Sequence, residues 1–278
     1  PPPPPPFFFH ADAGIGHFCL SRGLGDVYKR QGLHVITGPG GNIGVRLTSK
    51  GVILIDDKFP QDFQEIRSLV AEVTDLPVRY VVNTHHHGDH SGSNAGFLQI
   101  GEVITHKNAR ENMVRGNQDG LPRLIYSDET SVFLGGVEVR VFYMGRGHTN
   151  GDSVVYFPDL KTVHGGDLLH GIAPFIDYAN GGSSRGWVGT VNNILSLDFD
   201  TAIPGHGDIM DRRGVLNFRN QMEAVRQRMM TLIRGGLNGG VAPRRIVHTN
   251  LRWTQVEDGL FMQRSILGFF DEISVETQ

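Results

Sequence analysis

Side chains that can bind a metal gather in one short segment of the sequence. The run NTHHHGDH holds four of them within six residues: His85, His87, Asp89 and His90. In an extended backbone, residues two apart point to the same side, so His85 and His87 can face one point. Gly88 allows a turn, after which Asp89 and His90 can face a second point. Neutral imidazoles and carboxylates suit Zn²⁺, and they also admit Fe or Mn.

Three further candidate ligands lie in glycine-containing turns later in the chain. They are His148 in GRGHTNG, Asp167 in VHGGDL and His206 in IPGHGD. A neighbouring glycine lets the backbone approach a metal closely. Taken singly, Asp167 could be a turn former and the two histidines could be solvated loop residues. Together with the first cluster, they complete a plausible ligand set for two metals.

The elements that must position these residues alternate between strands and helices. A continuous apolar strand expected over 78–83 ends at the histidine cluster, which is where α/β sheets place ligands. Periodicity and turn residues predict the remaining elements. The other strands are 34–37, 43–48, 52–56, 103–105, 132–134, 137–143, 154–157, 162–164 and 202–203; the helices are 61–73, 91–97, 106–116, 185–197, 216–233 and 256–273. This order predicts an α/β protein with mixed sheets flanked by helices, in one domain over 32–278.

Composition excludes several classes of function. The 278 residues carry 26 Lys and Arg against 29 Asp and Glu, a net charge of −3. That balance argues against a nucleic-acid or membrane-surface partner and leaves a small-molecule substrate. No apolar run approaches the roughly 18 residues of a membrane-spanning helix. We therefore expect a soluble protein, and we leave the compartment (cytoplasmic, periplasmic or secreted) and the oligomeric state open.

The first 31 residues look foreign to the rest of the chain. They begin with the low-complexity run PPPPPPFFFH, and residues 21–31, SRGLGDVYKRQ, resemble the translation of a transposon-end sequencing adapter. We interpret residues 1–31 as an artefactual, disordered segment and set them aside from fold reasoning. The native chain is then expected to start near Gly32 or in lost upstream sequence, and a signal peptide could be missing. The single cysteine, Cys19, belongs to this segment, so no intrachain disulfide is expected.

The ordered ligand pattern resembles the metallo-β-lactamase superfamily of metallohydrolases. The family signature is H-x-H-x-D-H followed by His, then Asp or Cys, then a final His. It matches seven positions of this chain in order: His85, His87, Asp89, His90, His148, Asp167 and His206. The resemblance covers nearly all of residues 32–214. It implies a four-layer αβ/βα sandwich with a metal pair at one edge.

The resemblance also implies how the ligands divide between two zinc ions. The first metal would take His85, His87 and His148; the second would take Asp89, His90 and His206; Asp167 would bridge them. A metal-bound hydroxide would attack the carbonyl of a small ester, lactone, thioester or lactam. Beyond its role as a ligand, Asp89 would orient that hydroxide and take its proton, which makes it the expected catalytic residue.

Two positions differ from the cysteine-type lactamases of that family. Those enzymes carry Cys where this chain has Asp167, and a Lys three positions later that holds the drug's carboxylate, where this chain has His170. The carboxylate ligand looks more like glyoxalase II and the lactonase-type members. His170, Phe175 and Tyr178 are candidate substrate-binding residues, in or beside the loop that follows Asp167.

Other polar residues are expected outside the ligand set. Asp56 and Asp57 are candidates to orient the histidines, or else turn formers. His86 and His164 are expected to point away from the metals, and His106 and His248 to lie at the surface.

Three functions remain open beside the expected hydrolase. One is a mononuclear-iron enzyme of the same fold, similar to the sulfur dioxygenases. A second is a β-lactamase proper, for which the neutral His170 would hold an anion poorly. A third is a non-catalytic metal-binding protein, which the intact ligand set disfavours. A nuclease ranks low, because the nucleases of this superfamily carry added basic domains or an exosite arm and this chain is acidic.

Overall fold

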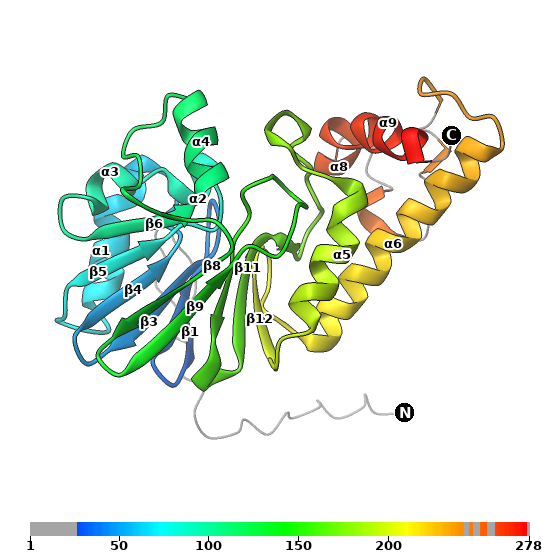
Figure 1. Ribbon diagram of the computed structural model, residues 1–278. Helices are drawn as coiled ribbons and strands as arrows, with labels where there is room; N and C mark the ends of the chain where they lie inside the picture. Colours follow the sequence, from blue (N-terminus) through cyan, green and yellow to red (C-terminus); the bar gives the residue numbers. More distant parts are fainter. Residues whose placement is uncertain (1–26, 242–244, 247–250, 255–258, 277–278) are drawn as a thin grey trace, which may run out of the picture.

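Two β-sheets lie at the centre of the molecule, and helices cover their outer faces (Figure 1). The structure is a computed structural model, and it describes residues 27–241, 245–246, 251–254 and 259–276. Helices α1 to α4 lie beside the first sheet, whereas α5, α6, α8 and α9 lie beyond the second (Figure 1). The expected four-layer αβ/βα sandwich is therefore the observed fold.

The first sheet has seven strands in sequence order. They are β1 (Val27–Arg30), β2 (Leu33–Ile36), β3 (Ile43–Thr48), β4 (Gly51–Ile55), β5 (Val78–Val82), β6 (Glu102–His106) and β7 (Leu124–Tyr126). Strands β1 to β4 are antiparallel and β4 to β7 are parallel. The parallel part is connected through α1 (Phe63–Ala71), α2 (Gly88–Ser91), α3 (Asn94–Phe97) and α4 (Lys107–Arg115). The histidine cluster follows the carboxyl end of β5, the usual position for a ligand site in such a sheet.

The second sheet has six strands in the order β13-β12-β11-β10-β9-β8. They are β8 (Glu129–Leu134), β9 (Val137–Phe142), β10 (Val154–Phe157), β11 (Thr162–His170), β12 (Thr201–His206) and β13 (Met210–Asp211). Helix α5 (Ser184–Leu195) connects the parallel pair β11 and β12, and α6 (Arg212–Arg234) follows β13. Asp167 lies in β11 and His206 ends β12, so this sheet contributes its candidate ligands at the same edge as β5.

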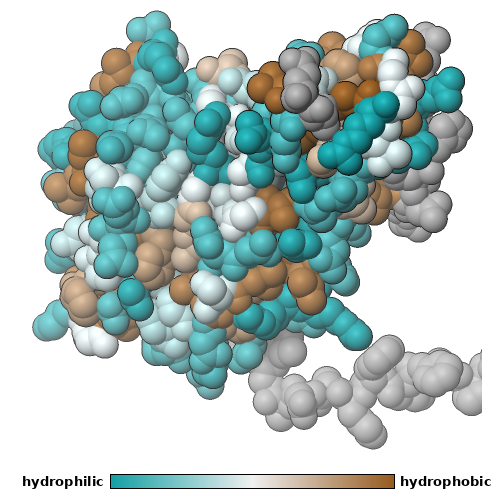
Figure 2. Space-filling model, turned by 45° about the vertical axis from the view of Figure 1, so that its right-hand side comes forward, coloured by the Kyte–Doolittle hydropathy of each residue, from teal (hydrophilic) through white to brown (hydrophobic). Residues whose placement is uncertain are grey.

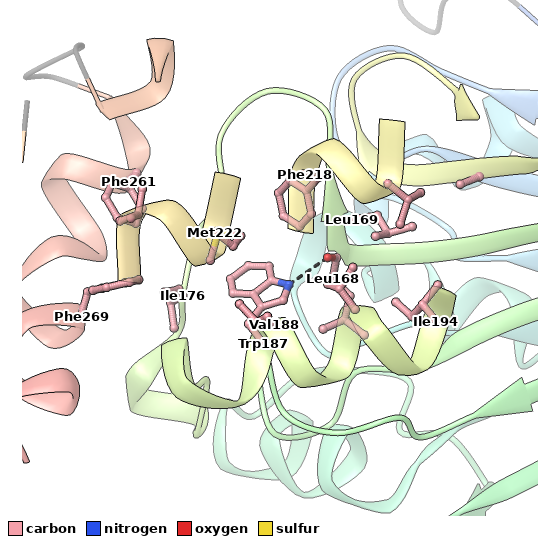
Figure 3. Close-up of a cluster of buried hydrophobic side chains, with 14 of the residues drawn as sticks. Leu168, Leu169, Ile176, Trp187, Val188, Ile194, Phe218, Met222, Phe261 and Phe269 are labelled. Carbon is pink, nitrogen blue, oxygen red and sulfur yellow. Dashed lines mark hydrogen bonds between the residues drawn. The ribbon is translucent and has the colours of Figure 1, made fainter. Parts of the chain in front are cut away.

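The C-terminal helices share a hydrophobic cluster with the second sheet (Figure 3). These helices are α8 (Leu260–Arg264) and α9 (Ile266–Glu276). Their Phe261 and Phe269 are fully buried in the same cluster as Trp187 of α5. The Trp187 Nε1 donates a hydrogen bond to the carbonyl oxygen of Leu168 at 2.9 Å. Because Leu168 follows Asp167, the packing of α5 fixes the backbone beside this candidate ligand.

Carboxylate side chains of α9 attach this helix to the start of α5. Glu272 accepts hydrogen bonds from Ser183 Oγ at 2.6 Å and from the backbone N–H of Ser184 at 2.7 Å. A negative charge at a helix N-terminus is favourable, because the first N–H groups of the helix lack intrahelical partners. The C-terminal helices are thereby positioned against the body of the fold.

The structure differs from the sequence-based expectation at the N-terminus. We set residues 1–31 aside, but Val27–Arg30 pair with β2, so the exclusion was wrong for these four residues. Without β1, strand β2 would present unpaired N–H and C=O groups at the edge of the sheet, and any neighbouring extended segment can pair with such an edge. The expected disorder of residues 1–26 lies outside the described residues.

Several other elements have limits that differ from the predicted ones; strands β8 and β12 and helix α6 are longer than predicted, and the helix expected over 91–97 is divided between α2 and α3. The single helix expected over 256–273 is divided, within its described part, into α8 and α9 at Ser265, whose Oγ accepts a hydrogen bond from the backbone N–H of Ile176. Strand β11 continues to His170 instead of ending at His164, because register shifts on both sides of Gly166 let it pass the Gly165–Gly166 pair. The short strands β7 and β13 were not predicted.

The surface is mixed in character. On the face seen in Figure 2, hydrophobic residues are interspersed among hydrophilic ones. No helix in the described part of the chain is long and apolar enough to cross a membrane.

Candidate metal centre

Seven side chains predicted from the sequence meet at one edge of the sandwich. His85 and His87 follow β5, Asp89 and His90 lie in α2, and His148 lies between β9 and β10. Asp167 and His206 come from β11 and β12. Their donor atoms form overlapping groups in which all atoms lie within 4.8 Å of one another. Residues distant in sequence are thus assembled into one cluster.

Three histidines converge through their ring nitrogens. His87 Nδ1 lies 3.1 Å from His85 Nε2 and 2.9 Å from His148 Nε2. His148 and His85 are almost completely buried. Three nitrogens in such a buried arrangement require either shared protons or a cation between them.

Hydrogen bonds on the opposite side of each ring show where its outer proton lies. His148 Nδ1 donates to the carbonyl oxygen of Phe175 at 2.6 Å, and His87 Nε2 donates to Asp177 Oδ2 at 2.9 Å. Thr84 Oγ1 donates to Asp56 and so accepts from His85 Nδ1 at 3.0 Å. Each ring therefore carries a proton on the side away from the cluster, and the opposite nitrogens of the three rings face one point. This is a donor arrangement that fits a metal cation.

A second group lies beside the first. His206 Nε2 is 3.2 Å from Asp89 Oδ2 and 3.2 Å from His90 Nε2. The remaining nitrogen of His90, Nδ1, lies 2.8 Å from Asp56 Oδ2 and donates to it, so Nε2 is the nitrogen that faces the cluster. Asp89, His90 and His206 could hold a second ion.

Asp167 lies between the two groups. Its Oδ1 is 3.2 Å from His90 Nε2, and its Oδ2 is 3.6 Å from His148 Nε2. Oδ1 is buried and accepts no hydrogen bond of suitable geometry from the described residues. A buried acceptor without a donor is costly, and a cation would satisfy it. A Cβ at Gly205 would collide with Oδ1, which explains why a glycine precedes His206.

Burial and neighbouring charges shift the pKa values of several groups in the cluster. Burial holds the pKa of His85 well below its usual range and lowers the pKa of His148 to about 3. Burial raises the pKa of Asp167, but interactions with the cluster histidines, above all with His90, outweigh it and set the pKa well below its usual range. Burial lowers the pKa of His90, but Asp167 and Asp56 outweigh it and raise the pKa well above its usual range. A metal at Nε2 would take the place of that proton.

One of the two predicted orienting carboxylates contacts the cluster. Asp56 is fully buried at the end of β4, where its φ of 67° turns the chain, and its carboxylate binds both His90 and Thr84. Asp57 points elsewhere and accepts a hydrogen bond from the backbone N–H of Ser93 at 3.0 Å. The two neighbours therefore have separate roles.

Asp56→Asn is expected to lower zinc affinity by about 10–100-fold, because loss of an orienting partner has effects of this size. The amide would keep the shape of the side chain, but it would no longer favour the proton on His90 Nδ1. Zinc affinity measured by competition with a chelating dye tests this. Asp75→Asn, at an exposed position, is the control. Equal affinity in both variants would remove Asp56 from the site.

Sequence reasoning missed the partner of His87. Asp177 lies beside the predicted pocket residues, and its carboxylate also accepts from Asn180 at 2.7 Å. Burial raises the pKa of Asp177, but hydrogen bonds from His87 and Asn180 reverse this and hold the pKa below its usual range. The loop that contains Asp177 was already expected to line the site. A carboxylate in that loop was therefore the signal that could have identified Asp177.

A cavity of about 890 Å³ opens beside the cluster. His170 and Phe175, two predicted substrate-binding residues, line it together with Asp89 and Asp167. Tyr178 was predicted there too, but it is not among the described lining residues. Its ring packs against Gly268 of α9, whose missing side chain leaves room for it.

The cavity also has walls that sequence reasoning did not predict. Trp253, Leu260 and Arg264, from the C-terminal segment, and Phe59 line it. No sequence pattern links these residues to the ligand motif, because only tertiary packing brings them there.

Other histidines lie outside the seven-residue cluster. His86 is buried with its Nε2 3.8 Å from Asp177, and His164 Nε2 donates to the carbonyl oxygen of Asn42 at 3.0 Å. His106 was expected at the surface but is buried, since it hydrogen-bonds Ser127 at 2.8 Å and caps the start of α4. His248 lies outside the described residues.

Comparison with known sequences gives the family. The sequence profile of the metallo-beta-lactamase superfamily matches residues 37–206, more than half of the chain. The chain therefore belongs to the metallo-beta-lactamase superfamily.

Two proteins of known name are similar in sequence to this chain. The 2,4-dinitroanisole O-demethylase subunit alpha of Nocardioides sp. (strain JS1661) is 28% identical over 169 residues, which are 59% of this chain and 51% of that protein. Metallo-beta-lactamase type 2 of Bacillus cereus is 28% identical over 175 residues, 59% of this chain and 66% of that protein. The chain thus spans between about half and two thirds of the length of these relatives.

Solved structures share the fold. The DIM-1 metallo-beta-lactamase matches with a TM-score of 0.64 and 19% identity, over 73% of this chain and 98% of that one. A metallo-beta-lactamase from Pontibacter korlensis matches with a TM-score of 0.62 and 21% identity, over 76% of this chain and 99% of that one.

Proposed function

We propose that this chain is a zinc-dependent hydrolase that binds two metal ions and cleaves a small ester, lactone, thioester or lactam. The observation that supports this most strongly is the set of hydrogen bonds that turns the inner ring nitrogens of His85, His87 and His148 toward one point. His85, His87 and His148 would hold one ion and Asp89, His90 and His206 the other. Asp167 would bridge them, because its two oxygens face the two groups.

Bound zinc supplies Lewis acidity, which polarises a carbonyl and lowers the pKa of a water molecule. Asp89 lines the cavity, so its carboxylate can accept a proton from the attacking water and return it to the leaving group. His170 Nδ1 accepts hydrogen bonds from the backbone N–H groups of Ile172 and Ala173, at 3.3 and 3.2 Å. Its proton is then on Nε2, which can donate to a substrate oxygen.

The test is a substrate screen of the zinc-loaded protein, with metal content measured on the same sample. The panel covers esters, lactones, thioesters and lactams, together with 2,4-dinitroanisole, on which a relative acts by its name. We expect turnover of at least one class, lost on chelation and restored by zinc. Silence across the panel with two zinc ions bound would favour a non-catalytic metal-binding protein. Iron in the purified protein, with oxygen uptake on a persulfide, would favour the dioxygenase-like alternative.

A further inference from the structure

The cavity beside the candidate metal centre has an exposed positive charge from the C-terminal helices. Arg264, the last residue of α8, is the only Lys or Arg among its described lining residues. It lies outside the region matched by the family profile, which ends at residue 206. Its position depends on the packing of α8 and α9 against the body of the fold.

Arg264 is available to bind a ligand. Its Cζ lies 5.8 Å from the centre of the Phe175 ring, and no carboxylate in the described part of the chain lies within ion-pair distance of it. The acidic residues that line the cavity already contact histidines of the cluster. Asp89 lies 3.2 Å from His206, and Asp177 lies 2.9 Å from His87.

His170 lines the same cavity but offers a different group. Its Nδ1 accepts hydrogen bonds from the backbone N–H groups of Ile172 and Ala173, so only Nε2 is left to contact a ligand. Among the described lining residues, Arg264 is therefore the side chain that offers a planar group with several N–H donors.

The walls next to Arg264 are apolar. Phe175, Trp253 and Leu260 line the same cavity, and the Phe175 ring stacks on His87 with centroids 5.8 Å apart. The guanidinium and the metal cluster thus share one aromatic neighbour, so a small molecule can reach both. Pockets of this size and character bind ligands with an apolar body and few fixed polar groups.

We propose that Arg264 is a specificity-determining residue that binds a carboxylate of the substrate while the scissile carbonyl lies at the metal centre. The planar guanidinium matches a carboxylate through two parallel hydrogen bonds. A single guanidinium balances one negative charge, so the substrate class is a monocarboxylate with an apolar body. The inference rests on the proposed hydrolase function, because that function places the carbonyl at the metals.

A binding experiment tests this without requiring turnover. The probes are 3-phenylpropanoate and its neutral amide, titrated calorimetrically into the zinc-loaded protein. Arg264→Ala is expected to lower the affinity for the carboxylate about tenfold and to leave the amide unchanged, and Arg264→Lys is expected to restore part of the loss. Arg67→Ala is the matched control, because Arg67 also lies over a phenylalanine ring, Phe63, but is not among the cavity residues.

Two results would overturn the proposal. If Arg264→Ala binds the carboxylate as tightly as the unaltered protein, the carboxylate is held elsewhere, for example by zinc. If Arg264→Ala loses affinity for both probes equally, the effect is structural.

Hydrolysis of 4-nitrophenyl hydrogen glutarate and 4-nitrophenyl pentanoate is measured in parallel. If neither ester is hydrolysed but the protein still prefers the carboxylate probe to its amide, the result contradicts hydrolysis of this ester class. The role of Arg264 in binding the carboxylate would be unaffected.

Discussion

Asp89→Ala is expected to lower turnover by about 10²–10⁴-fold, the range typical of a lost general acid–base. Asp89 contacts His206 and lines the cavity, so its loss would remove both a donor to the proposed second metal and the proposed proton acceptor. Zinc occupancy should therefore fall together with turnover. Steady-state kinetics and elemental analysis on the same samples provide the measurement.

His206→Ala separates these two roles of Asp89. This variant loses a ligand of the same group but keeps the carboxylate, so excess zinc should recover more turnover in it than in Asp89→Ala. Unchanged turnover in both variants would count heavily against the second metal position.

Trp187→Ala is expected to destabilise the fold by about 3–5 kcal/mol, the cost of truncating a large buried aromatic side chain. Trp187 is fully buried, and the hydrophobic cluster around it includes residues from both C-terminal helices. At about 2–4 °C per kcal/mol, the melting temperature should fall by roughly 6–20 °C. Zinc content should fall too, because the Trp187 side chain holds the backbone next to Asp167.

The control for Trp187→Ala is an aromatic truncation at the surface. Phe133 of β8 is 72% exposed, so Phe133→Ala should change the free energy of unfolding by no more than about 0.5 kcal/mol. Thermal unfolding of both variants compares them directly. Melting temperatures that fall equally would mean that Trp187 is not a central part of the core.

The ligand cluster could be predicted because its chemistry is local in sequence. His85, His87, Asp89 and His90 stand together after one buried strand, and glycines mark His148, Asp167 and His206. The structure brings all seven side chains together. Their role as metal ligands remains a prediction, since it rests on donor type and hydrogen bonding.

The residues around the cluster could not be predicted in the same way. Asp177 contacts His87 across 90 positions of sequence, and Arg264 reaches the cavity through the packing of α8. Neither contact leaves a periodic or spaced pattern in the chain. The same limit explains His106, which tertiary packing buries although its sequence context resembles an exposed helix start.

Several strands were predicted closely. Strands β3 and β10 have the predicted limits, and β5 differs from them by one residue. Prediction failed where local signals and tertiary structure disagree. Glycines did not end β11, and Ser265 divided a segment whose apolar spacing suited one helix.

The stoichiometry of bound zinc tests the central claim most directly. The claim is that one buried cluster of histidines and aspartates holds two ions, with Asp167 between them. Elemental analysis after zinc loading and removal of excess metal should give two zinc ions per chain, and anomalous scattering from crystals at the zinc edge should show both peaks at this cluster. One ion per chain, none, or peaks elsewhere in the molecule would contradict the account.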